Sequence, residues 1–239
     1  MAVAIVTGSS QGLGKALARA LAGQGWSLVL DARNPVRLRE AETEIRALAR
    51  HDAHVTATAG DVTDADHRRA LAAAADALGR LDLLINNAST LGASPLPALS
   101  ELPPDTLRRV FEVNAIAPLA LIQATLPLLR RSPDPRVLNI TSDAAVEHYE
   151  TWGGYGASKA ALDHLGATLA VEEPVVRVWT VDPGDMRTEM HQNAFPGEDI
   201  SDRPEPEAVV PVLLDLIAGR APSGRIKAVE LAPAGGPRS

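Results

Sequence analysis

Short runs rich in β-branched residues alternate with longer Ala- and Leu-rich stretches along nearly the whole chain. The short runs predict strands at 2–7, 26–31, 53–59, 81–86, 135–141, 175–182 and 225–231. The longer stretches have helical spacing and predict helices at 12–24, 35–50, 64–79, 104–131, 154–173 and 205–219. Strand-helix-strand units of this kind build a parallel sheet with helices on both faces. We therefore expect an α/β fold with a seven-stranded parallel sheet.

Length and composition narrow the function classes. The 239 residues show no internal repeat and no linker, so we expect a single domain over 1–239. A net charge of −7 without a basic patch argues against a nucleic-acid partner, and the absence of cysteine excludes disulfides and thiolate metal sites. No apolar run approaches the length of a membrane span, and the N-terminus enters the first strand without a basic leader. We expect a cytoplasmic protein with no membrane partner.

One long segment, 183–206, lacks any periodicity and is rich in Pro, Gly, Asp and Glu. A long irregular loop within a compact domain is usually functional. We therefore predict a loop or lid on the substrate side of the site. The tail 232–239 is expected to be frayed.

A glycine-rich turn connects the first predicted strand to the first predicted helix. Glycines let the backbone turn tightly and approach a ligand, and free N–H groups at the helix N-terminus can bind a pyrophosphate. The spacing Gly-x-x-x-Gly-x-Gly differs from the general dinucleotide fingerprint, and no Lys-Ser/Thr pair follows as in a Walker loop. Its position favours dinucleotide binding over a helix start that is merely rich in small residues. The predicted contacts here are Gly8, Ser10, Gln11, Gly12, Leu13 and Gly14.

Tyr155 and Lys159 stand at i and i+4 of a predicted helix and so share one face. An ammonium group beside a phenol stabilises the phenolate, which lowers the tyrosine pKa from its ordinary value of about 10. Ser142, upstream of the pair, could hold a carbonyl oxygen next to that acid. Tyr-x-x-x-Lys alone is common on ordinary helices, so the rest of the chain decides what the pair means.

Together these motifs resemble the short-chain dehydrogenase/reductase family. They occur in the family's order and near its usual spacings: Thr7-Gly8-x-x-x-Gly12-x-Gly14, Asn86-Asn87-Ala88, Asn114, Ser142, Tyr155-x-x-x-Lys159 and Pro183-Gly184-x-x-x-Thr188. The resemblance implies a Rossmann-type, doubly wound fold that transfers a hydride between a nicotinamide cofactor and a small carbonyl or alcohol substrate. It also implies a homodimer or homotetramer formed through the helices at 104–131 and 154–173.

The resemblance assigns four catalytic residues. Tyr155 would be the general acid in reduction and the general base in oxidation, and Lys159 would lower its pKa and hydrogen-bond the nicotinamide ribose. Ser142 would hold the substrate oxygen as charge develops on it. Asn114 would shape its helix and hold a water that relays protons to Lys159. A buried amide that satisfies the backbone is the simpler role and is compatible with the relay.

The cofactor is chosen at the end of the second strand, where an acid binds the ribose 2′-hydroxyl of NAD and an arginine accommodates the 2′-phosphate of NADP. By resemblance the selecting position is Ala32. Asp31 stands one place earlier and should point away from the ribose, because side chains alternate between the two faces along a strand. Arg33 falls where NADP-dependent members often carry a basic residue. We therefore favour NADP(H) over NAD(H), although a register slip of one residue would make Asp31 the selector.

Two further groups of cofactor contacts follow from the resemblance. Asp61 and Val62 would contact the adenine, with a helix cap as the alternative role of Asp61. Asn87 and Ala88 would line the adenosine side, next to Ser89, which stands where the family usually has glycine.

At the nicotinamide end, Pro183 and Gly184 would let the backbone pass the ring closely, and Thr188 would bond its carboxamide, with Met186 between them. Asp143, directly after Ser142, departs from the family pattern. The candidate substrate contacts are His148, Trp152, His191 and Phe195.

Several alternatives stay open. A non-catalytic NAD(P)-sensing protein on the same fold would need no acid beside the nicotinamide, and a methyltransferase on a similar sheet would leave Tyr155 and Lys159 without a role. His51 and His54 have a spacing that metal ligands use, but nothing nearby completes a site, so we expect no metal.

Overall fold

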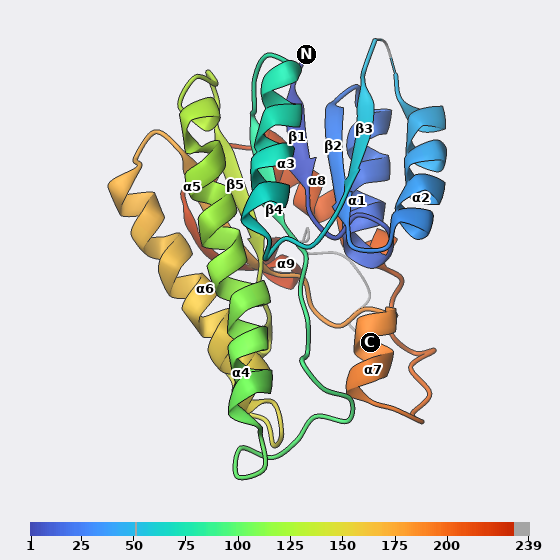
Figure 1. Ribbon diagram of the computed structural model, residues 1–239, viewed down its shortest axis with the longest axis vertical. Helices are drawn as coiled ribbons and strands as arrows, with labels where there is room; N and C mark the ends of the chain where they lie inside the picture. The colour runs from blue at the N-terminus through green and yellow to red at the C-terminus, as the bar shows by residue number, and fades with distance from the viewer. Residues whose placement is uncertain (51, 232–239) are drawn as a thin grey trace.

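The computed structural model describes residues 1–50 and 52–231 and contains one sheet of seven parallel strands in the order β3-β2-β1-β4-β5-β6-β7 (Figure 1). The strands are β1 (Val3–Val6), β2 (Ser27–Ala32), β3 (Val55–Ala59), β4 (Leu83–Asn86), β5 (Arg136–Ile140), β6 (Arg177–Asp182) and β7 (Gly224–Lys227). The strand order reverses between β1 and β4, as in doubly wound folds. The predicted fold class is confirmed.

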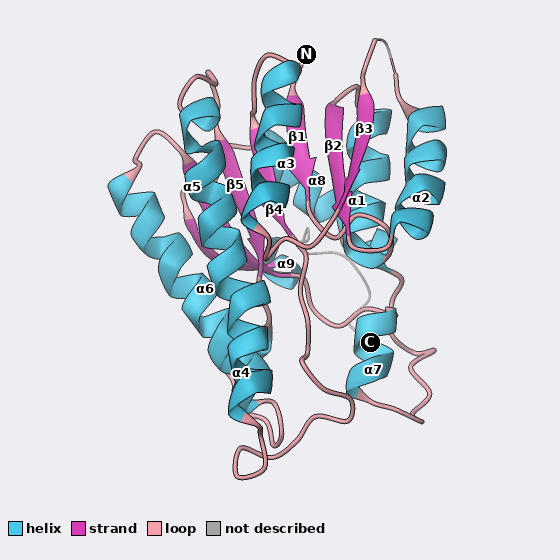
Figure 2. Cartoon of the chain, viewed as in Figure 1, coloured by secondary structure: helices cyan, strands magenta, loops and turns pink. Residues whose placement is uncertain are grey.

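Helices cover both faces of the sheet (Figure 2). On one face lie α1 (Gly12–Gly23), α2 (Pro35–Leu48) and α8 (Val210–Ala218), and on the other lie α3 (Ala65–Ala77), α5 (Ala117–Leu129) and α6 (Gly153–Glu172). The remaining helices are α4 (Pro104–Phe111), α7 (Glu189–Ala194) and α9 (Ala228–Leu231). Both faces bury apolar side chains, which is why the central strands read as continuous hydrophobic runs.

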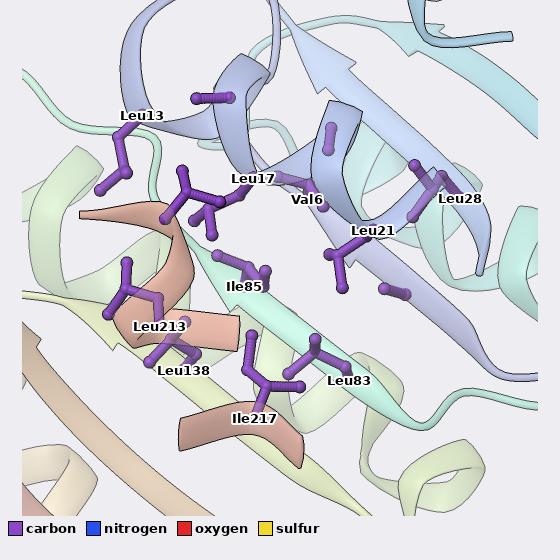
Figure 3. Packing of buried hydrophobic residues seen from close by; sticks show 14 of the residues in the cluster. Val6, Leu13, Leu17, Leu21, Leu28, Leu83, Ile85, Leu138, Leu213 and Ile217 are labelled. Carbon is purple, nitrogen blue, oxygen red and sulfur yellow. The ribbon is translucent and has the colours of Figure 1, made fainter. Parts of the chain in front are cut away.

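The packing of α1 shows how the sequence fixes these layers. Leu13, Leu17 and Leu21 recur at every fourth position and are buried against the sheet. Figure 3 shows them pointing toward strand residues such as Val6 and Ile85, with α8 completing the cluster. The glycine-rich turn is therefore anchored directly to the hydrophobic core through α1.

The helix predicted over 104–131 is divided. A π-helical turn, Glu112–Ile116, separates α4 from α5 and carries Asn114. π-helical turns are uncommon and often occur at functional sites, because the extra residue re-aims a side chain. Hydrophobic spacing alone does not reveal such a turn, since α4 and α5 continue through it without a break in the helical backbone.

Two boundaries near the C-terminus were predicted wrongly. The strand predicted over 225–231 ends at Lys227, because its neighbour β6 ends at Asp182, the residue paired with Lys227; residues 228–231 form α9. The segment 183–206, predicted without regular structure, contains α7, whose first turn is capped by the Thr188 hydroxyl. The tail 232–239, expected to be frayed, lies outside the described residues.

The helical stretch Pro104–Leu129 is long and apolar enough to cross a membrane by length and composition, which corrects the expectation that no such run exists. In the structure 56% of its apolar window is buried inside the protein. It packs against α3 and α6, as a core helix does.

Candidate active site

A cavity of about 680 Å³ opens at the carboxyl ends of the strands, at the position where the strand order reverses. Open α/β sheets bind their ligands at this position. Most of the predicted site residues line it: Gly8, Ser10, Gln11, Gly12, Leu13, Arg33, Asp61, Val62, Asn87, Ala88, Ser142, Trp152, Tyr155, Lys159, Pro183, Gly184, Met186, Thr188 and His191. Residues far apart in the sequence, from Gly8 to His191, thus lie together in one site.

The glycine-rich turn owes its shape to a lack of side chains. Gly8 and Gly12 have φ of +65° and +55°, which residues with a Cβ rarely adopt. A Cβ on Gly14 would lie 2.4 Å from both the Gly8 carbonyl oxygen and Asn87 Nδ2. Gly14 therefore does not line the cavity but lets the helix begin directly beneath the turn.

The residues that follow β4 are joined to the glycine-rich turn by hydrogen bonds. Thr7 Oγ1 accepts hydrogen bonds from the backbone N–H groups of Asn87 and Ala88, at 2.9 and 3.0 Å. Asn87 Nδ2 donates to the carbonyl oxygens of Thr7 and Gly8, at 2.9 and 3.2 Å. Asn87 thus shapes the glycine-rich turn as well as lining the cavity beside it.

Both carboxylate oxygens of Asp31 have partners inside the protein. One carboxylate oxygen lies 2.6 Å from His67 Nε2 and the other accepts a 3.3 Å hydrogen bond from the Gly8 N–H. Burial raises the pKa of Asp31, and the interactions with His67 and Gly8 oppose that rise. Both oxygens already have partners, and Asp31 also lines the cavity beside the glycine-rich turn. The expectation that Asp31 points away from the ribose stays a prediction.

A group of basic side chains lines the cavity beside the glycine-rich turn. Arg33 is exposed there, and Arg37 Nη1 hydrogen-bonds Gln11 Oε1 at 2.6 Å and Glu189 Oε2 at 2.9 Å, which joins α2 to α7 across the cavity mouth. The sequence analysis missed three basic residues that line the cavity, Lys15, Arg19 and Arg37, and also Asn34. The i, i+4 spacing of Lys15 with Arg19 on the predicted helix 12–24 was the available signal.

Tyr155 and Lys159 occupy the first turns of α6 and are both buried, at 8% and 2% exposure. Lys159 Nζ donates a 2.8 Å hydrogen bond to the carbonyl oxygen of Ile140, the last residue of β5, and lies 5.6 Å from the centre of the Tyr155 ring. Trp152 packs edge-on against that ring. The two side chains therefore share a face, as their spacing predicts, in a site that largely excludes water.

The expected effect of Lys159 on the tyrosine is wrong for the protein chain by itself. Burial raises the pKa of Tyr155 well above its ordinary value, and a hydrogen bond with Ser89 only partly opposes this. Burial also lowers the pKa of Lys159 to about 8. The ammonium charge is directed to the Ile140 carbonyl rather than to the phenol, so desolvation dominates both groups.

Asn114 is completely buried in the π-helical turn. Its side-chain nitrogen donates to the Thr90 carbonyl oxygen and to Ser158 Oγ, while its side-chain oxygen accepts from the Thr90 N–H and from Ser89 Oγ. These four bonds use the full capacity of the amide. The side chain therefore joins the loop after β4 to α6 as a buried amide, and the predicted water relay to Lys159 stays a prediction.

Asp61 does not cap the following helix, because α3 begins after Asp64, whose side chain makes the cap. Asp61 accepts hydrogen bonds from the Thr63 backbone and hydroxyl and from Arg109. Burial alone would raise its pKa, but these bonds outweigh it and lower the pKa of Asp61 to about 2. Asp61 is thus a fixed anion at the cavity wall.

The four candidate substrate contacts lie in different places. Trp152 and His191 line the cavity, and Phe195 supports them from behind, with ring centres 5.8 Å from Trp152 and 5.0 Å from His191. His148 does not line it, because the loop that carries it is exposed to solvent. His51 lies outside the described residues, so the expectation that His51 and His54 bind no metal stays a prediction.

Comparison with known proteins identifies the family of this chain. A family model described as short chain dehydrogenase matches residues 2–199. The chain belongs to this family of oxidoreductases. It is 38% identical over 203 residues to sepiapterin reductase of Meriones unguiculatus, which covers 81% of this chain and 77% of that protein.

Solved structures of family members have the same fold. A short chain dehydrogenase from Salmonella enterica serovar Typhi is 30% identical, with a TM-score of 0.86 over 95% of each chain. An alcohol dehydrogenase from Thermococcus sibiricus, complexed with 5-hydroxy-NADP, is 27% identical, with a TM-score of 0.84 over 95% of each chain.

The buried ammonium group of Lys159 predicts a pH-dependent stability. Its folded pKa of about 8 lies below the ordinary value of 10.5, so between these values the unfolded chain binds more protons and the wild type gains stability as the pH rises. We expect Lys159→Met to exceed the wild type in unfolding free energy by on the order of 1–3 kcal/mol at neutral pH. The difference should shrink as the pH approaches about 10.

Urea denaturation followed by circular dichroism at several pH values measures this difference. Tyr155 is present in both proteins, so its own titration cancels in the difference between them. A difference that is independent of pH, or a variant less stable than the wild type at neutral pH, would contradict the stated cause.

Proposed function

We propose that this protein is an NADP(H)-dependent carbonyl reductase, or alcohol dehydrogenase in the reverse direction. The observation that carries the proposal is the convergence of Tyr155, Lys159 and Ser142 on the cavity that begins at the glycine-rich turn. An acid-base side chain next to a dinucleotide cradle is the arrangement that carbonyl reduction needs.

The cavity fits a dinucleotide. Gly184 has φ of +78° and a Cβ there would meet nothing within 4 Å, while a Cβ on Gly12 would meet only the Thr188 side chain. Gly184 thus exposes backbone to open space, and Gly12 brings the turn close to Thr188, as a closely bound cofactor requires. The glycine-rich turn would hold the pyrophosphate, Asp61 and Val62 would contact the adenine, and Pro183 to Thr188 would border the nicotinamide. Bound NADPH would supply the hydride.

The side chains of this chain supply the proton and the orientation. In reduction, a hydride adds to the carbonyl carbon and the π electron pair of the C=O bond moves onto the oxygen, which takes the Tyr155 hydroxyl proton. Ser142 Oγ donates a hydrogen bond to the same oxygen and stabilises the developing charge. Lys159, buried beside the tyrosine, provides a cation that the phenolate left behind needs. Trp152 covers Tyr155 and excludes water from the transfer.

The proposal predicts a selective loss of turnover in Tyr155→Phe. The phenyl ring preserves the packing against Trp152 but has no proton to give, so kcat should fall about 10²–10⁴-fold. NADPH binding, measured by fluorescence titration, should be retained. The assay is NADPH oxidation over a panel of ketones, aldehydes and diketones.

Two outcomes would argue against the proposal. Unchanged turnover in Tyr155→Phe would remove the proposed acid. NADPH binding without turnover of any carbonyl by the wild type would favour the alternative, a non-catalytic sensor of the cofactor.

NADP(H) is favoured over NAD(H) by the charge around the end of β2. Ala32 stands at the position of the selecting acid, and Arg33 follows it at the exposed edge of the cavity. Lys15 and Arg37 line the same region, and each forms an ion pair with a glutamate, Glu44 and Glu189 respectively, so Arg33 carries the argument. The complex of the Thermococcus sibiricus relative with 5-hydroxy-NADP is consistent with this choice.

Arg33→Ala should weaken NADPH use specifically. A hydrogen bond to a phosphate is charge-assisted, so its loss should raise KM for NADPH about tenfold or more and leave KM for NADH nearly unchanged. Arg39→Ala is the matched control, because Arg39 is exposed on α2, the helix just after Arg33, hydrogen-bonds the Pro35 carbonyl and does not line the cavity. Equal effects on the two cofactors, or a wild-type preference for NADH, would refute the role of Arg33.

Three coarser expectations complete the proposal. The segment 183–206 would act as the substrate-side lid, with α7 held to α2 through Glu189 and Arg37. A homodimer or homotetramer would form through the helices at 104–131 and 154–173. The cytoplasmic location and the absence of a nucleic-acid partner stay predictions from the sequence.

A further inference from the structure

The hydroxyl proton of Ser142 is already in use. Ser142 Oγ donates a 2.8 Å hydrogen bond to Asp143 Oδ1 and accepts a 3.2 Å hydrogen bond from the Ala144 N–H. A hydroxyl has a single proton. While that proton is donated to Asp143, Ser142 offers an incoming carbonyl oxygen only a lone pair, which repels it. The role proposed for Ser142 therefore requires that something displace its bond with Asp143.

Asp143 is a firmly held anion at the cavity wall. The Ala144 N–H donates to Asp143 Oδ1 at 2.7 Å, and the Tyr149 hydroxyl donates to Asp143 Oδ2 at 2.8 Å. Burial alone would raise the pKa of Asp143, but the hydrogen bonds from Tyr149, Ser142 and Ala144 outweigh it and lower that pKa. Asp143 also lines the cavity next to Ser142, within reach of a substrate.

We propose that Asp143 makes this site selective for carbonyl compounds that carry a hydroxyl or N–H group on the carbon next to the carbonyl. The inference rests on the proposed reductase function and names its substrate class. A donor on the substrate takes the place of Ser142 on Asp143, and the Ser142 proton then turns to the carbonyl oxygen. The 2.8 Å between Ser142 Oγ and Asp143 Oδ1 matches the short separation of two oxygens on adjacent carbons.

A substrate without such a donor has no way to make this exchange. It must either leave the Asp143 carboxylate without the Ser142 proton or place its carbonyl oxygen against a lone pair. Hydrogen bonds to charged groups are stronger than neutral ones, so the difference should be at least about tenfold in kcat/KM. The aromatic side chains of Trp152 and His191, which also line the cavity, suit a flat group beside the carbonyl.

Three matched ketones test the inference: methyl phenyl ketone, hydroxymethyl phenyl ketone and methoxymethyl phenyl ketone. The methoxy compound has the same neighbouring oxygen but no proton to donate, so it controls for the reactivity of the carbonyl. With NADPH, the wild type should prefer the hydroxy over the methoxy ketone by at least about tenfold in kcat/KM. In Asp143→Ala the preference should fall to near one, because Ser142 is released for every ketone, and Asp143→Asn should lie between.

Glu147→Gln is the control for charge. It removes one negative charge four residues away on an exposed loop and should keep the wild-type preference. If Asp143→Ala does not fold, the wild-type preference and its reduction in Asp143→Asn decide the question.

The outcomes separate this inference from the proposed function. Equal use of the hydroxy and methoxy ketones by the wild type, or an unchanged preference in Asp143→Asn or in folded Asp143→Ala, overturns the role of Asp143 and leaves the reductase standing. Reduction of none of the three ketones overturns the role of Asp143. It overturns the reductase as well only if a wild type that binds NADPH reduces no carbonyl of the wider panel.

Discussion

The site depends on one constraint, the common direction of the seven strands. Because every strand is parallel, all their carboxyl ends meet at one edge of the sheet. The chain leaves β1 toward α1 on one face and leaves β4 toward the other face, so the two connections diverge and open a crevice between them. The glycine-rich turn, Asn87, Ser142 and Pro183 each follow directly after a strand and are therefore brought together.

This edge also concentrates polar groups that the fold has to satisfy. Asn114 is saturated by four hydrogen bonds, Lys159 is bound to the end of β5, and Asp31 is shared by His67 and Gly8. Burying a charged or polar group costs free energy unless it has partners. Lys159 illustrates the cost, since burial lowers its pKa to about 8. Polar and charged side chains are buried at this edge of the sheet at a cost in free energy that apolar side chains would not have.

The sequence predicted the fold class, the strand positions and most of the cavity lining, because these follow from periodicity and from the place of each motif at a strand end. It could not predict which hydrogen bonds each polar side chain makes. The side-chain amide of Asn114 has all its hydrogen-bonding positions filled. The pKa of Tyr155 is set by burial rather than by Lys159. His148 was misplaced because a loop position does not reveal which way the loop turns. Lys15 and Arg37 were missed because their approach to the cavity depends on how α1 and α2 pack.

The central claim is that the turn after β1 binds a nicotinamide dinucleotide, and the most direct measurement is a titration of NADPH into the protein followed by tryptophan fluorescence, with Trp152 at the cavity wall as reporter. Gly14→Ala places a methyl group 2.4 Å from the Gly8 carbonyl oxygen, whereas Gly23→Ala, at the other end of the same helix, meets nothing within 4 Å. We predict saturable binding to the wild type and to Gly23→Ala, and a loss of at least about tenfold in affinity in folded Gly14→Ala. Equal affinity in all three proteins, or no binding to the wild type, would contradict the account.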